Sequence, residues 1–446
     1  MKLRDFQEHG SEFLQGKQEA MLLDDAGLGK SAQVLAAADK LQLPRILCVG
    51  PAVASVSWRS QVRIWSPKRR FVDLDMAGVF GLELPGVYFV SYDMLSRRAN
   101  SDLLGQLLGC VDWDLLVLDE AQYLKNPGSN RTSAVYGAAT TGRADPLALV
   151  SNARRVWLLS GTLTPNHNGE LYPHLRALFG LPSEQHEFED DYCVVRETVY
   201  GRSIARNRNT AQLRRLIAPH ILRRLKSAVL TELAPMEFFT APIALDEAVV
   251  RKILAYSMAP GKYALAEAAA LSADPDALLA FLEEQPNFAA ARRDLGLAKT
   301  PGCAAWVEDR LNSGERKVIV FAVHTAVIDG LRNALADHSP VVLDGRTTTA
   351  GRIRAVDAFQ NDPATRVFIG QLVAAGTAIT LTASSCVFFA EYAGTPGLNY
   401  QAASRAHRIG QNCGVQVYFG MVPDSLDAAI AETAKRRARE IADLFD

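Results

Sequence analysis

The chain has 446 residues, with 48 Lys and Arg against 49 Asp and Glu. Its net charge therefore does not by itself indicate a nucleic-acid partner. Its length predicts two or three units, and any polyanion has to meet a local patch. Six scattered cysteines without a C-x-x-C pair argue against a metal cluster and for a reducing compartment. Neither the N-terminal MKLRDFQEHG nor any stretch of about 18 residues is continuously apolar, so we expect a soluble, cytoplasmic protein with no membrane partner.

Short apolar runs predict buried parallel strands that alternate with helices. Each run ends in Gly, Pro, Ser or Asp and is followed by residues with helical spacing. One set lies at residues 45–51, 87–93, 113–121 and 155–162, and a second lies at residues 317–325, 340–345, 365–371, 385–392 and 415–421. The sequence therefore predicts an α/β protein with two parallel sheets in tandem.

The stretch between the two sets, roughly residues 170–300, has few strand signals and is rich in Ala, Leu, Glu and Arg. Residues 264–285 are a helix-rich example, interrupted by one Asp-Pro turn. We expect helical insertions here and a lobe boundary near residue 240. The predicted organisation is a first lobe at residues 1–239, a helical insertion at 240–300 and a second lobe at 301–446.

Residues 21–31, MLLDDAGLGKS, place a Gly-rich turn between an apolar run and a good helix. In a P-loop, backbone N–H groups and a helix N-terminus point at phosphate oxygens, Lys adds charge, and Ser or Thr holds Mg²⁺. Residues 27–31, GLGKS, fit this pattern, but Asp24 stands where the first Gly of G-x-x-x-x-G-K-[ST] belongs. Alone, the stretch is also compatible with a Gly-rich helix start.

Two adjacent acids, Asp119 and Glu120, follow the apolar run LLVL directly. A nucleotide triphosphatase needs a carboxylate for Mg²⁺ and usually another for the attacking water, both at a strand end beside the P-loop. The alternative role, a helix N-cap, is open for the pair taken alone. Downstream of a GKS loop, the catalytic interpretation is favoured.

Taken in order, the motifs make the chain resemble the Swi/Snf-type branch of the superfamily 2 helicases and translocases. The series runs from LRDFQ at residues 3–7 to RAHRIGQ at 405–411 and spans almost the whole chain. ILRRLKSAVL and RAHRIGQ are typical of this branch and not of RNA helicases, and RRDLGLAK at 292–299 resembles the annealing-helicase subgroup. The other matching stretches are DDAGLGKS, VGPAVASVSWRSQ, VSYD, DEAQYLKN, LLSGTLTPN, VIVFAVHT, LDGRTTTAGR and AAGTAITLTAS.

Three stretches depart from the family pattern. The acidic box reads DEAQ instead of DEAH, the next motif reads SGTLTPN, and Thr377, Ile379 and Thr380 stand in a segment usually richer in Gly and Leu. None of these changes removes a charged group of the active site. We therefore still expect hydrolysis, with a coupling between the lobes that can differ from that of the family.

The resemblance implies two RecA-like lobes and assigns roles at the ATP site. Lys30 would hold the β- and γ-phosphates, Ser31 and Asp119 would position Mg²⁺, and Glu120 would orient or deprotonate the attacking water. Gln7, with Arg4 nearby, would recognise adenine. The implied nucleotide contacts are Arg4, Gln7, Gly27, Leu28, Gly29, Lys30 and Ser31.

On the second lobe, Arg405 and Arg408 match the arginine-finger positions, with Gln401 in the same motif. Their spacing puts the arginines on one face if QAASRAHRI, residues 401–409, is a helix. The alternative is a solvated basic helix face. Because fingers and loop lie on opposite lobes, the resemblance implies that hydrolysis requires closure and that opening follows phosphate release.

Contacts to the DNA backbone are expected from hydroxyls, backbone N–H groups and scattered basic residues. Trp58 and Trp65 are better explained as the apolar stripe of a helix packed on the sheet. The basic residues of the C-terminal helix are read as a solvated face. The candidate contacts are Ser57, Arg59, Tyr92, Lys125, Asn126, Gly376 and Thr377.

The sequence thus predicts an ATP- and Mg²⁺-dependent motor that tracks along double-stranded or forked DNA and remodels or rewinds it. Two alternatives are an RNA- or DNA-unwinding helicase of the same superfamily and a DNA-binding module that does not turn over. We expect a monomer in a bacterial or phage-host cytosol, since no targeting module is recognisable. Protein partners, polarity and step size are not predicted.

Overall fold

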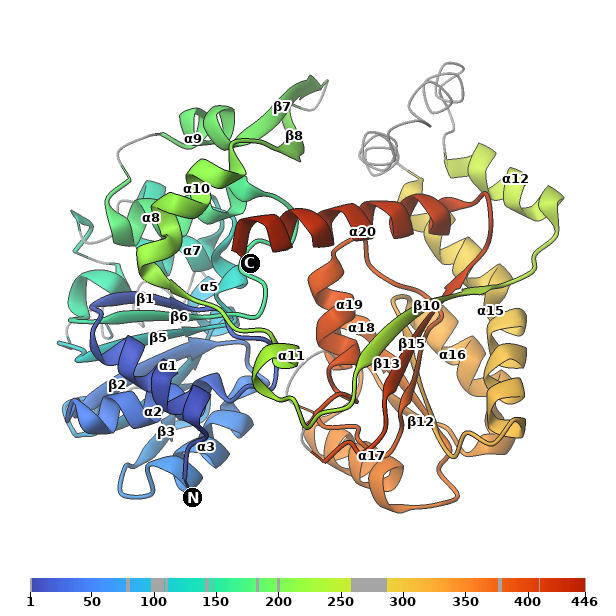
Figure 1. Ribbon diagram of the computed structural model, residues 1–446, viewed down its shortest axis with the longest axis horizontal. Coiled ribbons are helices and arrows are strands. Elements are labelled where there is room, and N and C mark those ends of the chain that lie inside the picture. Colours follow the sequence, from blue (N-terminus) through green and yellow to red (C-terminus); the bar gives the residue numbers. More distant parts are fainter. Residues whose placement is uncertain are drawn as a thin grey trace. The chain divides into compact units, whose positions relative to one another are not determined.

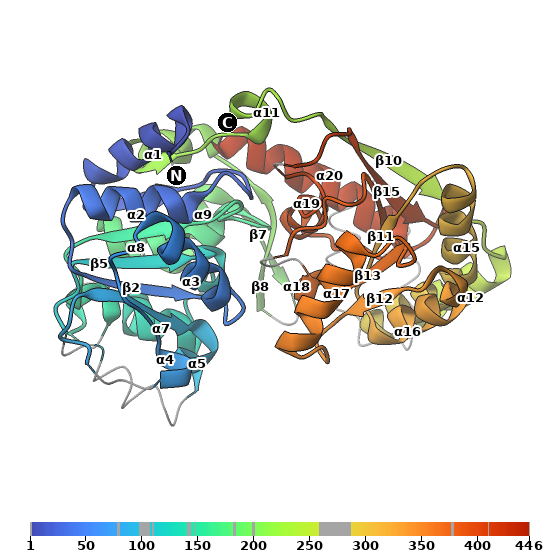
Figure 2. The same cartoon turned by 90° about the horizontal axis from the view of Figure 1, so that it is seen from below.

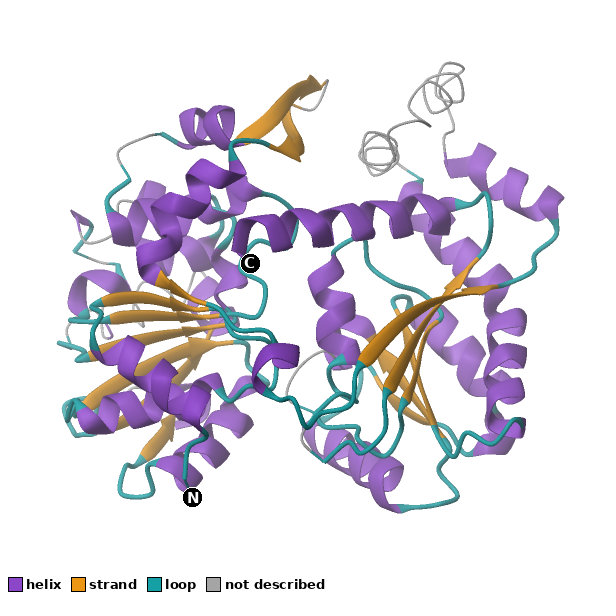
Figure 3. Ribbon diagram, viewed as in Figure 1, coloured by secondary structure: helices purple, strands orange, loops and turns teal. Residues whose placement is uncertain are grey.

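The computed structural model describes residues 2–77, 81–97, 108, 111–140, 144–146, 148–181, 184–198, 201–257, 287–375, 379–408 and 410–445. The chain divides into two compact units (Figure 1). Unit 1 comprises Met1–Val229 and Glu440–Asp446, and unit 2 comprises Leu230–Arg439. Each is built on a parallel sheet with helices against it (Figure 3). The predicted fold class is confirmed.

The sheet of unit 1 has seven parallel strands in the order β3-β4-β2-β5-β6-β1-β9. Successive side chains of a strand point to opposite faces. In β2, Ile46 and Cys48 join one core, whereas Leu47 and Val49 join the other, so the whole run is apolar. The strands are β1 (Glu19–Leu22), β2 (Arg45–Gly50), β3 (Phe71–Asp73), β4 (Gly86–Ser91), β5 (Leu115–Asp119), β6 (Val156–Leu159) and β9 (Ile221–Leu222).

Helices cover both faces of this sheet. Leu14, Val34 and Trp58 bring the first three helices into one core, and later helices fill the other with residues such as Val135 and Leu175. The helices are α1 (Asp5–Gln15), α2 (Lys30–Lys40), α3 (Ala54–Trp65), α4 (Leu74–Ala77), α5 (Tyr92–Ser96), α7 (Asn130–Tyr136), α8 (Tyr172–Phe179), α9 (Gln185–Tyr192), α10 (Thr210–Ile217) and α11 (Lys226–Val229).

The sheet of unit 2 has six parallel strands in the order β10-β15-β14-β11-β13-β12. One continuous core of apolar residues joins its strands and helices. The strands are β10 (Met236–Pro242), β11 (Val318–Ala322), β12 (Val341–Leu343), β13 (Val367–Gln371), β14 (Cys386–Phe389) and β15 (Val415–Met421). The helices are α12 (Glu247–Ser257), α15 (Phe288–Asn312), α16 (Thr325–Ala334), α17 (Thr349–Asn361), α18 (Leu372–Ala375), α19 (Pro396–Ala403) and α20 (Leu426–Phe445).

The compact units divide ahead of residue 240, the expected lobe boundary. β10 pairs with β15 along its whole length, from Met236 with Val415 to Pro242 with Met421, and so joins the edge of the second sheet (Figure 2). This pairing carries the residues from Leu230 onward into unit 2. The end of the chain returns to unit 1, where Leu444 is buried in a core cluster.

The middle of the chain contains strands that its composition did not predict. Besides α8, α9, α10, α12 and α15, it forms β10 and an antiparallel hairpin of β7 (Cys193–Thr198) and β8 (Gly201–Asn207). The hairpin was missed because charged residues interrupt its apolar alternation. Residues 264–285, expected to be helical, lie outside the described residues. Among the described helices, none is long and apolar enough to cross a bilayer.

Candidate nucleotide site

The Gly-rich stretch forms the turn between β1 and α2. Gly27 and Gly29 have φ of 92° and 74°, in the left-handed region that favours glycine, and Gly29 is the N-cap of α2. A Cβ on Gly29 would lie 2.5 Å from Nε2 of Gln7. Helix α2 begins at Lys30, so its unpaired N–H groups and dipole are available to an anion at the loop. The turn therefore has the geometry of a phosphate cradle.

Lys30 folds its side chain over this turn. Its Nζ donates to the carbonyl oxygen of Asp24 (2.6 Å) and, at the limit of a hydrogen bond, to that of Asp25 (3.4 Å). Ser31 follows in the first turn of α2 and is partly buried. The ammonium group therefore lies within the loop whose backbone forms the cradle.

Asp24, the departure from the P-loop pattern, has a structural role. Its side chain is fully buried and both carboxylate oxygens accept from Arg224, at 2.9 Å from Nε and 2.5 Å from Nη2. A buried carboxylate needs such a partner. Residue type and spacing did not predict a role for Arg224, which lies in the stretch ILRRLKSAVL.

Gln7 reaches the cradle from helix α1. Its Nε2 donates to the carbonyl oxygen of Leu28 (3.2 Å), and its Oε1 accepts from the backbone N–H of Arg4 (3.0 Å) in a capping box. Arg4 itself is the exposed N-cap of α1. The structure thus brings Gln7 against the loop, with Arg4 three residues before it.

The acidic pair lies at the carboxyl end of β5, as expected. Oδ2 of Asp119 accepts from the indole Nε1 of Trp58 (2.8 Å), and Oδ1 accepts from the backbone N–H of Glu120 (3.1 Å). Burial, reinforced by the charge of Glu120, raises the pKa of Asp119 to about 6, although the Trp58 hydrogen bond and the charge of Lys30 act in the opposite direction. The acids and the loop lie at the same edge of the sheet, because Asp119 pairs with Leu159 and Leu159 pairs with Leu22, just before the loop.

Glu120 has a backbone conformation that is uncommon for a residue with a side chain. Its φ is 51°, and it is the N-cap of the short 3₁₀ helix Ala121–Leu124. Its Oε2 accepts from Nε2 of Gln122 (2.8 Å), while Oε1 of Gln122 accepts from the hydroxyl of Ser160 (2.7 Å). The Gln of the DEAQ box therefore links the acid to the start of SGTLTPN.

Trp58 packs as predicted and also has a polar role. The residue is 1% exposed, within the core beneath α3, and its ring N–H holds Asp119. Trp65 is partly buried and donates to Oε1 of Gln61 (3.0 Å). The apolar interpretation of both side chains is compatible with these positions, but it missed the link from Trp58 to the acidic pair, which connects residues far apart in sequence.

The predicted DNA contacts lie in different environments. Arg59 is exposed and Ser57 is partly buried on α3, and the guanidinium of Arg59 lies 5.6 Å from the ring centre of Phe71. Lys125 forms an ion pair with Glu170 (2.7 Å). The exposed Asn126 accepts from the N–H of Gly128 (3.0 Å). Gly376 and Thr377 lie outside the described residues.

Tyr92 differs from the other DNA candidates because it is buried. It is 1% exposed, its hydroxyl donates to the carbonyl oxygen of Asp119 (3.1 Å), and its ring stacks on Tyr123 with centres 5.5 Å apart. Burial raises the pKa of this hydroxyl well above its usual range. A side chain in this position supports the acidic strand end and presents no surface to DNA.

The arginine motif of unit 2 does not form the continuous helix expected for QAASRAHRI. Helix α19 ends at Ala403, and the following residues turn tightly, with the N–H of Arg405 donating to Ala402 and that of Arg408 to Ala406. The carbonyl of Arg405 instead accepts from the N–H of Leu381 (2.8 Å). Tertiary pairing therefore overrides the helical spacing in this segment.

The two arginines are both partly or fully withdrawn from solvent. Arg405 is 5% exposed and Gln401 is 8% exposed. Arg408 donates from Nη1 to the hydroxyl of Thr380 (3.1 Å), and burial lowers its pKa to about 10. None of the carboxylates in the described parts of the chain forms an ion pair with Arg408. Among the described residues, its guanidinium is therefore held by a neutral hydroxyl and by no carboxylate.

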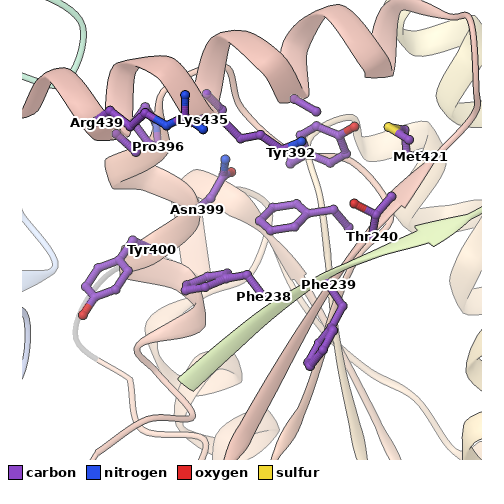
Figure 4. A pocket seen from close by; sticks show the side chains of 14 residues that line it. Phe238, Phe239, Thr240, Tyr392, Pro396, Asn399, Tyr400, Met421, Lys435 and Arg439 are labelled. Atoms are coloured by element: carbon purple, nitrogen blue, oxygen red, sulfur yellow. The ribbon is translucent and has the colours of Figure 1, made fainter. Parts of the chain in front are cut away.

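Unit 2 also contains an apolar cavity of about 420 Å³ between α20, α19 and strands β10 and β15 (Figure 4). Ala431, Ala434 and Ala438 face it from α20 at helical spacing, and their small side chains leave the space open. Phe238 and Phe419 form part of the opposite wall. None of the predicted site residues lines this cavity, so it is separate from the nucleotide motifs.

Two family models match this chain, one over each set of motifs. Residues 6–250 match the family model described as SNF2-related domain, and residues 304–410 match the helicase conserved C-terminal domain. SWI/SNF-related matrix-associated actin-dependent regulator of chromatin subfamily A-like protein 1 of Xenopus tropicalis is 28% identical over 448 residues, which cover 97% of this chain and 44% of that protein. Human DNA annealing helicase and endonuclease ZRANB3 is 27% identical over 462 residues, which cover 98% and 40%.

Among solved structures, the Sulfolobus solfataricus SWI2/SNF2 ATPase core in complex with dsDNA aligns with a TM-score of 0.46 and 20% identity, over 100% of this chain and 97% of that one. The chain spans less than half the length of the two curated relatives named above. The predicted resemblance to the Swi/Snf branch, and to annealing helicases within it, is confirmed by the family models and these relatives.

Proposed function

The chain belongs to the SNF2-related domain family, and from this membership and the geometry of its nucleotide loop we propose that it is a DNA-stimulated ATP hydrolase that translocates along duplex DNA. The observation that carries the proposal is the register of three strands: Asp119 at the end of β5 pairs with Leu159 of β6, and Leu159 pairs with Leu22 at the end of β1, from which the Gly-rich loop continues. A lysine in a phosphate cradle and a carboxylate at the same edge of the sheet, two strands away, are the two charges that phosphoryl transfer needs on one side.

The nucleotide would lie with its phosphates on the turn from Gly27 to Ser31. Lys30 would leave the Asp24 carbonyl for the β- and γ-phosphates, because a phosphate oxygen is a charged acceptor and a carbonyl is not. Gln7, already against the loop, would contact adenine with the help of Arg4.

Magnesium would be held by Asp119 and Ser31. Among the described residues no group of three or more His, Cys, Asp or Glu could hold a metal ion alone. The two oxygen ligands that Asp119 and Ser31 would supply suit Mg²⁺, which usually takes one or two protein oxygens and completes its coordination with phosphate oxygens and water. The ion would neutralise phosphate charge, and Glu120 would orient the attacking water.

The arginines of unit 2 would stabilise the charge that develops on the γ-phosphate. Arg408 supports this role because it is withdrawn from water and has no carboxylate partner among the described residues. Arg405 and Gln401 would act beside it from the same motif. Since the cradle belongs to unit 1 and these arginines belong to unit 2, hydrolysis would need groups from both units, and a cycle of closure and opening linked to phosphate release would drive a step along DNA.

The DNA surface would use the remaining candidates. Ser57 and Arg59 on α3, Lys125 and Asn126 after the acidic box, and the motif at 376–377 would contact phosphates without reading bases. Double-stranded or forked DNA is the proposed polymer, since one relative is described as a DNA annealing helicase. Rewinding or remodelling of that DNA is the proposed outcome of translocation.

The test is steady-state ATP hydrolysis at fixed salt, alone and with duplex DNA, forked DNA, single-stranded DNA and RNA. Glu120→Gln is the blank, and Lys30→Ala should remove turnover with every polymer. Stimulation by duplex or forked DNA would support the proposal. Stimulation by RNA alone would assign the chain to an RNA-unwinding helicase instead, and no turnover with any polymer would leave a module that only binds DNA.

A further inference from the structure

Arg224, between β9 and α11 in the stretch ILRRLKSAVL, contacts the nucleotide loop although it is not one of the residues expected to bind ATP. Its guanidinium forms a two-pronged ion pair with Asp24, and the side chains are 11% and 0% exposed. Planar, bidentate pairing of this kind fixes orientation as well as distance. One end of the loop is therefore held in a single position by Arg224.

The same guanidinium also reaches the two helices beside the loop. Nη2 donates to Oε1 of Gln33 in α2 (2.8 Å), and Nη1 donates to the carbonyl oxygen of Phe6 in α1. Gly10 in α1 makes room for this network, because a Cβ there would lie 1.7 Å from Oε1 of Gln33 and 2.6 Å from Nη2 of Arg224. Arg224 thus joins α1, α2 and the loop at one point.

The backbone around Arg224 continues the sheet alongside the loop. The N–H of Leu23 donates to the carbonyl of Leu222 (2.8 Å), and the N–H of Asp25 donates to that of Arg224 (3.0 Å). Beyond them, the N–H of Lys226 donates to Oδ2 of Asp25 (2.8 Å). Backbone and side chain therefore hold the same loop residues in place.

Two short connections lead from this network to the residues that would bind ATP. The carbonyl of Asp24, whose carboxylate Arg224 holds, accepts from Lys30 (2.6 Å). Gln33, which Arg224 also holds, donates to the carbonyl of Leu28 (3.2 Å), and that carbonyl accepts from Gln7 as well. A displacement of Arg224 would move the partners of both Lys30 and Gln7.

We propose that Arg224 is a positioning residue of the nucleotide site, which sets the loop and helix α1 relative to each other and thereby sets affinity and base preference for ATP. The inference rests on the proposed function, because it assumes that Lys30 and Gln7 contact the nucleotide. Arg224 itself touches neither base nor phosphate in this scheme. Lysine could not replace it, since a point charge cannot hold both oxygens of Asp24 and Gln33 at once.

Arg224→Lys tests the role without removing the charge that Asp24 needs. KM for ATP should rise about tenfold, the effect of one charge-assisted hydrogen bond lost between a displaced Lys30 and phosphate. The preference for ATP over GTP should fall, and kcat at saturating ATP should fall less than KM rises. The matched control is Arg223→Lys, one residue earlier, whose guanidinium lies 5.4 Å from the ring centre of Phe445. The control should keep the KM and base preference of the original protein.

An unchanged KM and base preference in Arg224→Lys, or the same change in Arg223→Lys, would overturn the proposal. If Arg224→Lys does not fold, the double variant Asp24→Asn with Arg224→Gln removes both buried charges together and is read by the same two measurements. Loss of turnover in Lys30→Ala separates the outcomes. With that loss and a silent Arg224→Lys, only the positioning role fails; without it, the assigned ATP chemistry fails.

Discussion

Asp119→Asn is predicted to stabilise unit 1 at neutral pH while it abolishes hydrolysis. The pKa of Asp119 is raised from 3.8 to about 6, so the folded protein disfavours the charged form. An acid whose pKa is raised in the folded state does not change the free energy of unfolding below about pH 4. Between about pH 4 and pH 6 it lowers that free energy progressively, and above about pH 6 the loss is constant. At pH 7.5 the ionised carboxylate therefore lowers the free energy of unfolding, and a neutral amide does not.

The size of the effect follows from the shift and the contacts. A shift of roughly two units corresponds to an upper limit of about 3 kcal/mol. Asp119 keeps part of its surface exposed, and solvent screening reduces this to about 1–2 kcal/mol. Asn can accept from Trp58 or from the N–H of Glu120 but not from both, which costs about 1 kcal/mol. The net gain should be up to about 1 kcal/mol, or about 2–4 °C in Tm.

The assay is thermal unfolding of the original protein and Asp119→Asn at pH 7.5 and pH 4.5, in EDTA so that no Mg²⁺ stabilises the carboxylate form. The variant should melt higher at pH 7.5, and the difference should shrink at pH 4.5, where the original Asp119 is largely protonated in the folded state. If the variant melts lower at pH 7.5, or if the difference in Tm does not depend on pH, burial does not disfavour the ionised form of Asp119.

Three further changes have defined outcomes. Trp58→Phe removes the hydrogen bond that lowers the pKa of Asp119, so the acid limb of the pH profile of kcat/KM for ATP should move to higher pH. An unchanged acid limb would show that Trp58 does not affect the pKa of Asp119. Lys299→Met leaves Asp427 buried without its 2.7 Å partner, and should lower the unfolding free energy of unit 2 by about 3–5 kcal/mol in urea titration. Gly29→Ala forces a side chain into φ 74° and should weaken ATP binding, measured by titration calorimetry, by at least about tenfold.

Local pattern was sufficient for the strands with both faces buried. β5 is a continuous apolar run that ends at Asp119, and β11 is apolar over its whole length, so the run of apolar residues is enough to predict each strand. β10 is an edge strand with exposed Phe238 and Phe239, and its partner β15 lies far along the chain, so its strand character depends on pairing that the sequence does not display. Continuous runs identify central strands, whereas edge strands need the partner.

In the candidate site, too, features formed by contiguous residues could be predicted, whereas those that depend on distant segments could not. The cradle and the acidic pair are contiguous in sequence, and both could be predicted from residue type and spacing. Arg224 and Trp58 could not, because each meets its carboxylate only when the sheet brings distant segments together. The turn after Ala403 was likewise missed because the carbonyl of Arg405 pairs with Leu381 instead of continuing the helix.

If Asp119 binds Mg²⁺ as proposed, its raised pKa makes metal binding release a proton, which gives the Mg²⁺ role a direct test. At pH 6 about half of the Asp119 side chains are protonated, and Mg²⁺ binds only the ionised form. Binding of Mg²⁺ with a non-hydrolysable ATP analogue should therefore release up to about half a proton per site, beyond what the analogue itself releases. Calorimetry in two buffers of different ionisation enthalpy measures this release, and Asp119→Asn should reduce it to the contribution of the analogue. Equal release from both proteins would place the metal away from Asp119.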